Sequence, residues 1–298
     1  MPESSIVIPD NPFLLANESA YQQWKKQKLE NYPHSITDLI VKIRDPFQLT
    51  AEELAAIKAL LRKTNMVIYA LGQQDVADKA IPEQLGRQLG ISSLDKNECA
   101  DEDGFTSIQV VEEGLHAIYI PYSEKGINWH VDGYYNRLSE QIYSMILHCV
   151  RPAAEGGENQ LWDNEIVYLL LRDENPDYIQ ALMAPDAMTI PENVLDGKLV
   201  RPDRSGPVFM LTEEGRLHMR YTARARNVIW KDDELTQKAQ QVLRELLNSN
   251  SDYKFEGRLE AGQGLICNNV LHTRLAFRDD KNHPRLLYRG RYFDRIRL

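Results

Sequence analysis

The sequence lacks any long apolar run. No stretch reaches the roughly 18 consecutive apolar residues that a membrane-spanning helix requires. Its first residues also lack the basic-then-apolar pattern of a secretory signal peptide. We therefore expect a protein that spans no membrane and works in the cytoplasm.

Cysteine and net positive charge are scarce as well. The three cysteines, Cys99, Cys149 and Cys267, are an odd number without CxxC spacing, which argues against a disulfide framework and favours free, packed thiols. The formal charge of −9, from 44 acidic and 35 basic residues, opposes binding to a polyanionic backbone. We expect no nucleic-acid partner but a small-molecule substrate, and a homo-oligomer is possible.

What is present is the composition of a globular chain, with 43% hydrophobic and 27% charged residues among 298. This length allows one large core, so we predict a single domain over residues 1–298. Its first part, residues 1–105, is predicted as a largely helical flank with the first strands. Apolar spacing, a Thr N-cap and β-forming residues predict helices at 18–32, 50–62 and 81–89, and a buried strand at 66–71.

The sequence pattern changes in residues 106–298, where short β-forming runs alternate with Gly, Pro and Asn. These runs are TSIQVV, HAIYIPY, QIYSMILHCV and NQLWD, followed by expected strands at 264–268 and 285–293. Helices are predicted at 165–171 and 232–248, and residues 186–215 are the candidate for a long loop or lid. The pattern is typical of an antiparallel barrel or jelly roll, so the predicted class is mainly β with flanking helices, α+β.

A possible metal site begins with the H-x-D pair His130 and Asp132, at the predicted end of a strand. Side chains two apart on a strand share a face, so both can reach one ion. This pair is common by chance and needs a third ligand, which His272 supplies after the strand-like segment 264–267. Two imidazoles and one carboxylate form the facial triad of non-haem iron(II) oxygenases, which leaves positions open for a cosubstrate and O2.

Two arginines follow the second histidine. Arg285 and Arg289 are four residues apart and therefore face the same way on a strand. Two guanidinium groups inside a barrel would be costly without carboxylates to pair with, and a dicarboxylate cosubstrate would supply them. The alternative is that one or both lie on the outer face in surface ion pairs.

Four segments together resemble the taurine dioxygenase and clavaminate synthase-like family of iron(II)- and 2-oxoglutarate-dependent oxygenases. They are WHVDG, AEGGENQLWDN, NNVLHTR and RLLYR, in that order within residues 105–295. The resemblance implies a double-stranded β-helix, with Arg285 on the distal carboxylate of 2-oxoglutarate and Arg289 near its C1 end. Asn159 takes the place of the family's Thr, which contacts the cosubstrate carboxylate. An intact Asp132 implies hydroxylation, desaturation or a related oxidation, because halogenating members lose this carboxylate.

Candidates for substrate contact lie on both sides of the metal pair and in a later basic segment. They are Asn128, Tyr134, Tyr135, Arg220, Arg224 and Arg226. The arginines could receive a carboxylate-bearing substrate such as an amino acid or another small organic acid. Equally, they could be solvated or paired with the abundant acidic residues.

Two other functions use the same barrel. A cupin-type metal-dependent isomerase or hydrolase could hold zinc or manganese with the same three ligands, but it would have no need for Arg285 and Arg289. A metal-free binding protein would have no physical reason to keep three desolvated ligands together. We therefore expect an oxygenase that uses iron(II), 2-oxoglutarate and O2 on a small polar substrate.

Overall fold

The structure is a computed structural model that describes residues 10–72, 75–96, 99–195, 197–224 and 228–298. The chain forms two compact units. Unit 1 consists of the described residues within Met1–Tyr32, Tyr134–Leu138 and Asn164–Ser251. Unit 2 consists of those within Pro33–Gly133, Ser139–Asp163 and Asp252–Leu298. None of the helices in the described ranges combines the length and apolarity needed to cross a bilayer.

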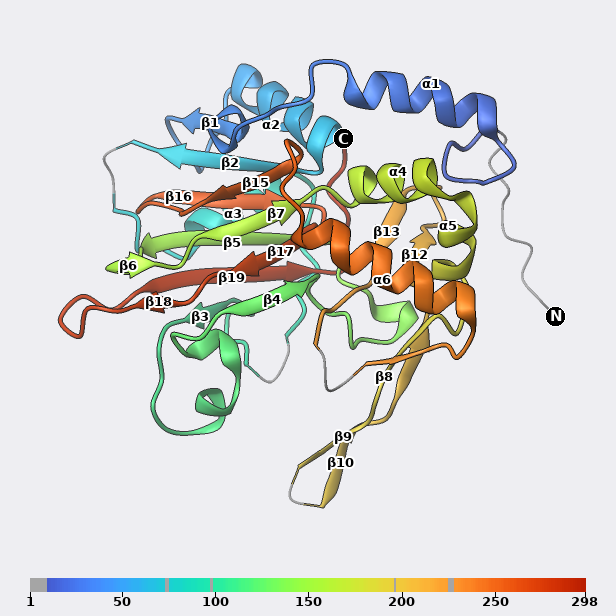
Figure 1. The fold of residues 1–298 in the computed structure, drawn as a ribbon. Helices are drawn as coiled ribbons and strands as arrows, with labels where there is room; N and C mark the ends of the chain where they lie inside the picture. The colour runs from blue at the N-terminus through green and yellow to red at the C-terminus, as the bar shows by residue number, and fades with distance from the viewer. Residues whose placement is uncertain (1–9, 73–74, 97–98, 196, 225–227) are drawn as a thin grey trace. The chain divides into compact units, whose positions relative to one another are not determined.

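Unit 2 contains the two main sheets (Figure 1). The six-stranded sheet has the order β1 (Ile40–Ile43), β2 (Met66–Leu71), β16 (Gln263–Cys267), β5 (Ser144–Arg151), β19 (Leu286–Tyr292) and β3 (Thr106–Ile108). The four-stranded sheet has the order β15 (Lys254–Gly257), β7 (Asn159–Trp162), β17 (Leu271–Arg274) and β4 (Ile127–His130), and a small pair joins β18 (Phe277–Arg278) to β6 (Glu155–Gly156). Apart from the parallel pair β1 and β2, the pairings are antiparallel.

Two helices cover one face of the six-stranded sheet. Helix α2 (Ala51–Thr64) begins at the predicted Thr50 cap, whose side chain accepts from the Glu53 backbone N–H, and α3 (Ala80–Gln88) contacts β5 and β19. Alternate residues of the strands, such as Tyr288 and Tyr292 on β19, pack into this core. The period of two turns Arg289 and Arg291, which alternate with them, to the opposite face of the sheet. The sheet therefore carries its charged residues away from the helices.

Unit 1 is built around three helices from the middle of the chain. It contains α1 (Glu18–Leu29), α4 (Asn164–Glu174), α5 (Pro176–Leu182), α6 (Glu234–Asn248) and the short strands β8 (Met188–Ile190), β9 (Asn193–Leu195), β10 (Lys198–Arg201), β11 (Arg204–Gly206), β12 (Phe209–Leu211), β13 (Leu217–Met219) and β14 (Ile229–Trp230). Contacts of α5 and α4 with α6 bury the apolar face of α6. The predicted helices at 165–171 and 232–248 are thus confirmed.

Three local predictions differ from the structure. The run HAIYIPY is not a strand but two 3-10 turns, Leu115–Ile118 and Ile120–Tyr122, because Pro121 cannot donate to a ladder. Helix α5 was not predicted, although Asn175 caps it and Pro176 opens it, a recognisable start signal. The described residues of this segment, 186–195 and 197–215, contain the short strands β8 to β12 rather than an irregular loop. Their role as a lid stays a prediction.

Candidate metal centre

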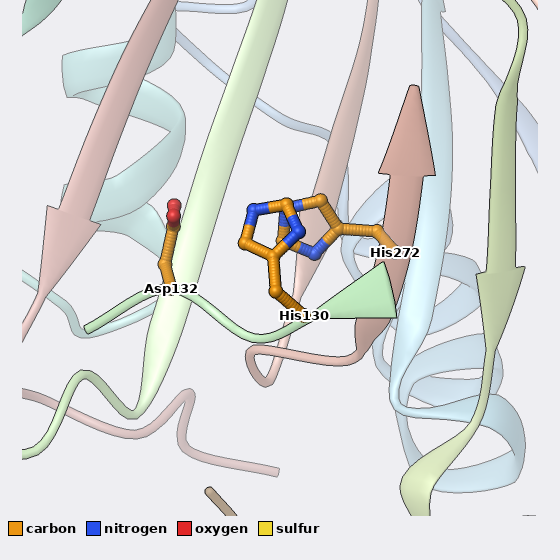
Figure 2. A group of neighbouring side chains, drawn as sticks. All are labelled: His130, Asp132 and His272. Carbon is orange, nitrogen blue, oxygen red and sulfur yellow. The ribbon is translucent and has the colours of Figure 1, made fainter. Parts of the chain in front are cut away.

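The candidate ligands converge where two neighbouring strands of unit 2 pair. Strands β4 and β17 are antiparallel, and their register sets His272 directly opposite His130, with ring centroids 4.2 Å apart. One ligand atom each from His130, Asp132 and His272 lies within 4.8 Å of the others. Figure 2 shows His130 and Asp132 on one segment of the chain, and the His272 side chain extending from another strand toward the His130 ring. In the described ranges this is the one group of three or more His, Cys, Asp or Glu side chains arranged to hold a metal ion.

Both histidines are fixed in the same way. Nδ1 of His130 lies 2.9 Å from the carbonyl of Asn128, and Nδ1 of His272 lies 2.9 Å from the carbonyl of Val270. A carbonyl only accepts, so each Nδ1 carries the proton and each Nε2 keeps a free lone pair. That is the tautomer in which a histidine binds a metal through Nε2. Asn128 contributes only its backbone carbonyl to this arrangement, and the residue is exposed.

Asn269 holds the third candidate ligand in place. Its side-chain oxygen accepts from the Asp132 backbone N–H at 2.9 Å, and its amide donates to the carbonyls of Asp132 at 2.9 Å and Ile142 at 2.6 Å. Asn269 is fully buried and has a positive φ of 50°, a conformation that Asn tolerates better than most residues. It joins the turn before β17 to the segment after β4. The sequence prediction missed this residue.

The charges around the candidate ligands favour the metal-binding forms. Burial raises the pKa of Asp132, but the nearby guanidinium groups of Arg289 and Arg291 outweigh burial and hold this pKa well below its usual range. Burial lowers the pKa of His130 to about 3, with the neighbouring His272 acting in the same direction, and burial also lowers the pKa of His272. The carboxylate is therefore ionised and both imidazoles are neutral at neutral pH, as metal ligation requires.

Only one of the two carboxylate oxygens of Asp132 has a partner among the described residues. Oδ1 lies 3.3 Å from Nη1 of Arg289, whereas the buried Oδ2 has no hydrogen-bond partner in the described part of the chain. A buried carboxylate oxygen without a partner is costly. A cation between Oδ2 and the two imidazoles would satisfy it, so the donor set fits a divalent metal.

The structure also brings together two residues predicted for the cosubstrate. Arg285 and Asn159 line the same hollow of unit 2, about 210 Å³ including its open mouth. Its other lining residues are Cys149, Pro152, Ala153, Gly157, Arg258, Leu259 and Leu287. The Arg285 side chain is 5% exposed and forms no salt bridge with any described residue, and its guanidinium lies 5.1 Å from the Phe277 ring. Burial lowers the pKa of Arg285 to about 10, which leaves a buried cation without a paired anion.

The remaining substrate candidates belong to unit 1. Tyr134 is 9% exposed and packs edge-on against Tyr135 at 5.1 Å, and Arg224 is exposed. The fully buried guanidinium of Arg220 donates to backbone carbonyls of its own unit, which gives it a structural role. The acceptors are those of Tyr134, Met188, Gly206 and Arg204. Arg226 lies outside the described residues.

A family model described as taurine catabolism dioxygenase TauD, TfdA family, matches residues 28–291. The chain belongs to this family. Among curated relatives of this TauD/TfdA chain, a uridine-5'-phosphate dioxygenase from Amycolatopsis sp is 30% identical over 169 residues, which are 55% of this chain and 60% of the relative. A protein of the same name from Streptomyces sp is 29% identical over 195 residues, 64% of this chain and 70% of that relative. The match thus spans about 60% of the length of the first relative.

Solved structures share the fold of this TauD/TfdA chain. An asparagine oxygenase in complex with Fe(II), 2S,3S-3-hydroxyasparagine and succinate has a TM-score of 0.56 at 15% identity and covers 81% of each chain. PvcB, an Fe, alpha-ketoglutarate dependent oxygenase from an isonitrile synthetic pathway, has a TM-score of 0.52 at 16% identity over 86% of this chain and 85% of PvcB. The family and the mainly β, jelly-roll fold predicted from the sequence are therefore confirmed, and the comparisons support the predicted class of enzyme, a dioxygenase with iron and 2-oxoglutarate. They do not favour the cupin-type or metal-free alternatives.

Proposed function

We propose that this protein is an iron(II)- and 2-oxoglutarate-dependent oxygenase in which His130, Asp132 and His272 hold the metal. The observation that carries the proposal is their convergence within 4.8 Å around a buried, unpartnered carboxylate oxygen. When bound, the iron supplies the reaction of O2 with 2-oxoglutarate, which releases succinate and CO2 and oxidises a substrate C–H bond. The intact Asp132 favours hydroxylation or desaturation over halogenation.

In this proposal Arg285, Arg289 and Asn159 bind 2-oxoglutarate. The buried guanidinium of Arg285 has no paired anion among the described residues. It could therefore donate two parallel hydrogen bonds to the distal carboxylate of 2-oxoglutarate. Arg289 would meet the C1 end, beside the metal ligand that it already contacts. Asn159 donates to the Thr273 carbonyl at 2.8 Å, and its amide has a second hydrogen to offer.

The substrate is a small organic anion in this proposal. Relatives named uridine-5'-phosphate dioxygenase make a nucleoside 5'-monophosphate the first compound to test, ahead of the amino acids and organic acids suggested by the sequence. A single nucleotide also fits an acidic protein that we do not expect to bind nucleic acid. Asn128, Tyr134, Tyr135 and Arg224 stay candidates for substrate contact.

Location and assembly are further parts of the proposal. Cys149 and Cys267 are free and buried, which suits a reducing compartment such as the cytoplasm. We also propose that the two compact units act together as one oxygenase domain, that residues 186–215 form its lid, and that a homo-oligomer is possible.

Anaerobic titration with Fe(II) and 2-oxoglutarate tests the proposed function. We expect a visible metal-to-ligand charge-transfer band in the wild type, and no band in His130→Ala. The control His34→Ala removes an exposed histidine and should leave the band unchanged. A folded, iron-loaded wild-type protein that binds 2-oxoglutarate without this band would contradict the proposal.

A further inference from the structure

Several arginines of unit 1 gather around Tyr134. The buried guanidinium of Arg220 donates to the carbonyl of Tyr134 at 2.9 Å and to that of Arg204 at 2.6 Å, so it joins these two backbone segments. The charges of Arg201 and Arg224 both act on the Tyr134 hydroxyl, which also forms a hydrogen bond with the Thr222 side chain, and Arg204 acts on Arg201. The positive charges of three different segments thus meet beside one tyrosine.

These charges are not neutralised. Within the described residues no acidic side chain forms a salt bridge with Arg201, Arg204 or Arg224. Arg201 donates to the carbonyls of Pro202 at 2.9 Å and Pro191 at 2.7 Å, contacts that orient a guanidinium without cancelling its charge. Asp203 does act on Arg201, but it is the weakest of the electrostatic neighbours.

Arg204 also lacks an anionic partner among the described residues, and one of its donors has no acceptor there. Its Nη1 donates to the carbonyl of Asp203 at 3.2 Å, whereas its Nε is buried and has no hydrogen-bond partner in the described ranges. An unsatisfied buried donor on a charged group destabilises the free protein. In a chain with a net charge of −9, acidic residues are abundant, yet none of those that the structure describes forms a salt bridge with Arg204. An anionic ligand would satisfy the donor and the charge together.

We propose that Arg201, Arg204 and Arg224, with the Tyr134 hydroxyl, form a subsite for a phosphoryl group of the substrate. The inference rests on the proposed function and names the substrate class. Three guanidinium groups exceed what one carboxylate neutralises, whereas a phosphate monoester carries about −1.5 to −2 charges at pH 7 and three acceptor oxygens. Arginine forks match this geometry through paired charge-assisted bonds.

The position of Tyr134 in the chain connects this subsite to the chemistry. Tyr134 follows the candidate ligand Asp132 by two residues, so covalent geometry keeps their Cα atoms within about 7 Å of each other. Arg220 then acts as a positioning residue, because it fixes the backbone of Tyr134 and Arg204 rather than presenting free donors to a ligand.

Calorimetric titration of the full-length, Mn(II)-loaded protein tests the inference with three probes: uridine-5'-phosphate, uridine and inorganic phosphate. We expect uridine-5'-phosphate to bind at least about tenfold more tightly than uridine, and inorganic phosphate to compete with it. Each of Arg201→Gln, Arg204→Gln and Arg224→Gln should weaken uridine-5'-phosphate by roughly 10- to 100-fold, the usual effect of losing a charged hydrogen bond, and leave uridine unchanged. Arg204→Lys should recover part of the affinity because it restores the charge.

The control is Arg244→Gln, which removes an exposed arginine from helix α6 of the same unit and should bind like the wild type. Far-UV circular dichroism and thermal unfolding of each variant check that it folds. Equal affinity for uridine-5'-phosphate and uridine, binding that the three variants leave intact, or no binding of either phosphate probe would each overturn the subsite. The charge-transfer band is measured separately, by anaerobic addition of Fe(II) and 2-oxoglutarate to metal-free protein from the same preparations. A band without phosphate binding rejects the subsite alone, and the absence of the band rejects the proposed function.

Discussion

Nη1 of Arg289 lies 3.3 Å from Oδ1 of Asp132, so a half-buried arginine of strand β19 neutralises the carboxylate of the candidate metal centre. The side chains of the pair are 13% and 5% exposed. Arg291, two residues further on the same face of the strand, pairs with Asp95. The protein therefore supplies its own cation to Asp132 when no metal is bound.

Replacing Arg289 should destabilise the metal-free protein more than the metal-bound one. In Arg289→Gln the buried Asp132 loses its counter-charge, and breaking such a pair costs about 3–5 kcal/mol of the free energy of unfolding. Mn(II) should recover much of this loss, because the metal supplies positive charge to the same carboxylate. Urea unfolding with and without Mn(II), in the absence of 2-oxoglutarate, measures both effects.

A surface pair in the same unit provides the matched control. Arg278 lies 3.4 Å from Glu155, but their side chains are 76% and 68% exposed. Arg278→Gln should therefore change the free energy of unfolding by no more than about 1 kcal/mol. If Arg289→Gln behaved like Arg278→Gln in metal-free protein, the pair with Asp132 would have no energetic role.

Arg285→Ala should weaken 2-oxoglutarate binding far more than metal binding. Losing the partner of a buried carboxylate costs about 2–5 kcal/mol, which corresponds to at least a roughly 30-fold weaker affinity. Titration of the charge-transfer band gives the affinity for 2-oxoglutarate, and electron paramagnetic resonance of Mn(II) gives metal loading. An equal loss of both would place Arg285 outside the cosubstrate site.

Arg258 offers a control within the same hollow. It lines the hollow with Arg285, but Glu260 lies 3.3 Å from its guanidinium and already neutralises it. Arg258→Ala should therefore change the affinity for 2-oxoglutarate much less than Arg285→Ala does.

The candidate ligands could be predicted because their pattern is local. His130 and Asp132 are two apart at a strand end, and His272 follows another apolar segment, so each signal lies within a few residues. The register that sets His272 opposite His130 was not predictable, because it depends on pairing between distant segments. For the same reason the sequence could not reveal Asn269, which bonds to a backbone 137 residues away.

Tertiary context also explains what the sequence could not predict. Arg220 lies in a polar, basic segment, and nothing in its neighbours signals that four carbonyls will surround its guanidinium. The run HAIYIPY has β-forming residues, but Pro121 and the positive φ of Gly114 turn it into 3-10 geometry. Propensity predicted the larger helices, whose caps and apolar spacing agree with their packing.

The pH dependence of stability should include a contribution from His148. This residue is fully buried on β5, with Nδ1 2.6 Å from the Tyr69 hydroxyl and Nε2 2.8 Å from the Val76 carbonyl, so both ring nitrogens have hydrogen-bond partners. Burial lowers the pKa of His148 below the 6.5 of an unfolded histidine. Below about pH 6.5 the unfolded chain binds a proton that the folded protein does not, so the free energy of unfolding falls as the pH falls.

Urea unfolding at pH 7.5 and pH 5.0 tests this contribution. The wild type should lose more stability between the two pH values than His148→Gln does, although the variant is less stable at both. His34→Gln, at an exposed position of the same unit, should lose as much as the wild type. The same loss in His148→Gln and in the wild type would show that His148 does not contribute.

Asn269 should matter for metal affinity although it is not a ligand. Asn269→Gly keeps the positive φ but removes the side chain that bonds to the Asp132 backbone in both directions. Without these bonds Asp132 is free to move relative to the two imidazoles, and the affinity for Mn(II) should fall by roughly 10- to 100-fold, as for other residues that orient a ligand. Asn31→Gly is the control, because Asn31 is exposed and also has a positive φ of 51°. Calorimetric titration with Mn(II) measures both variants, and unchanged affinity in folded Asn269→Gly would mean that the backbone holds Asp132 without this side chain.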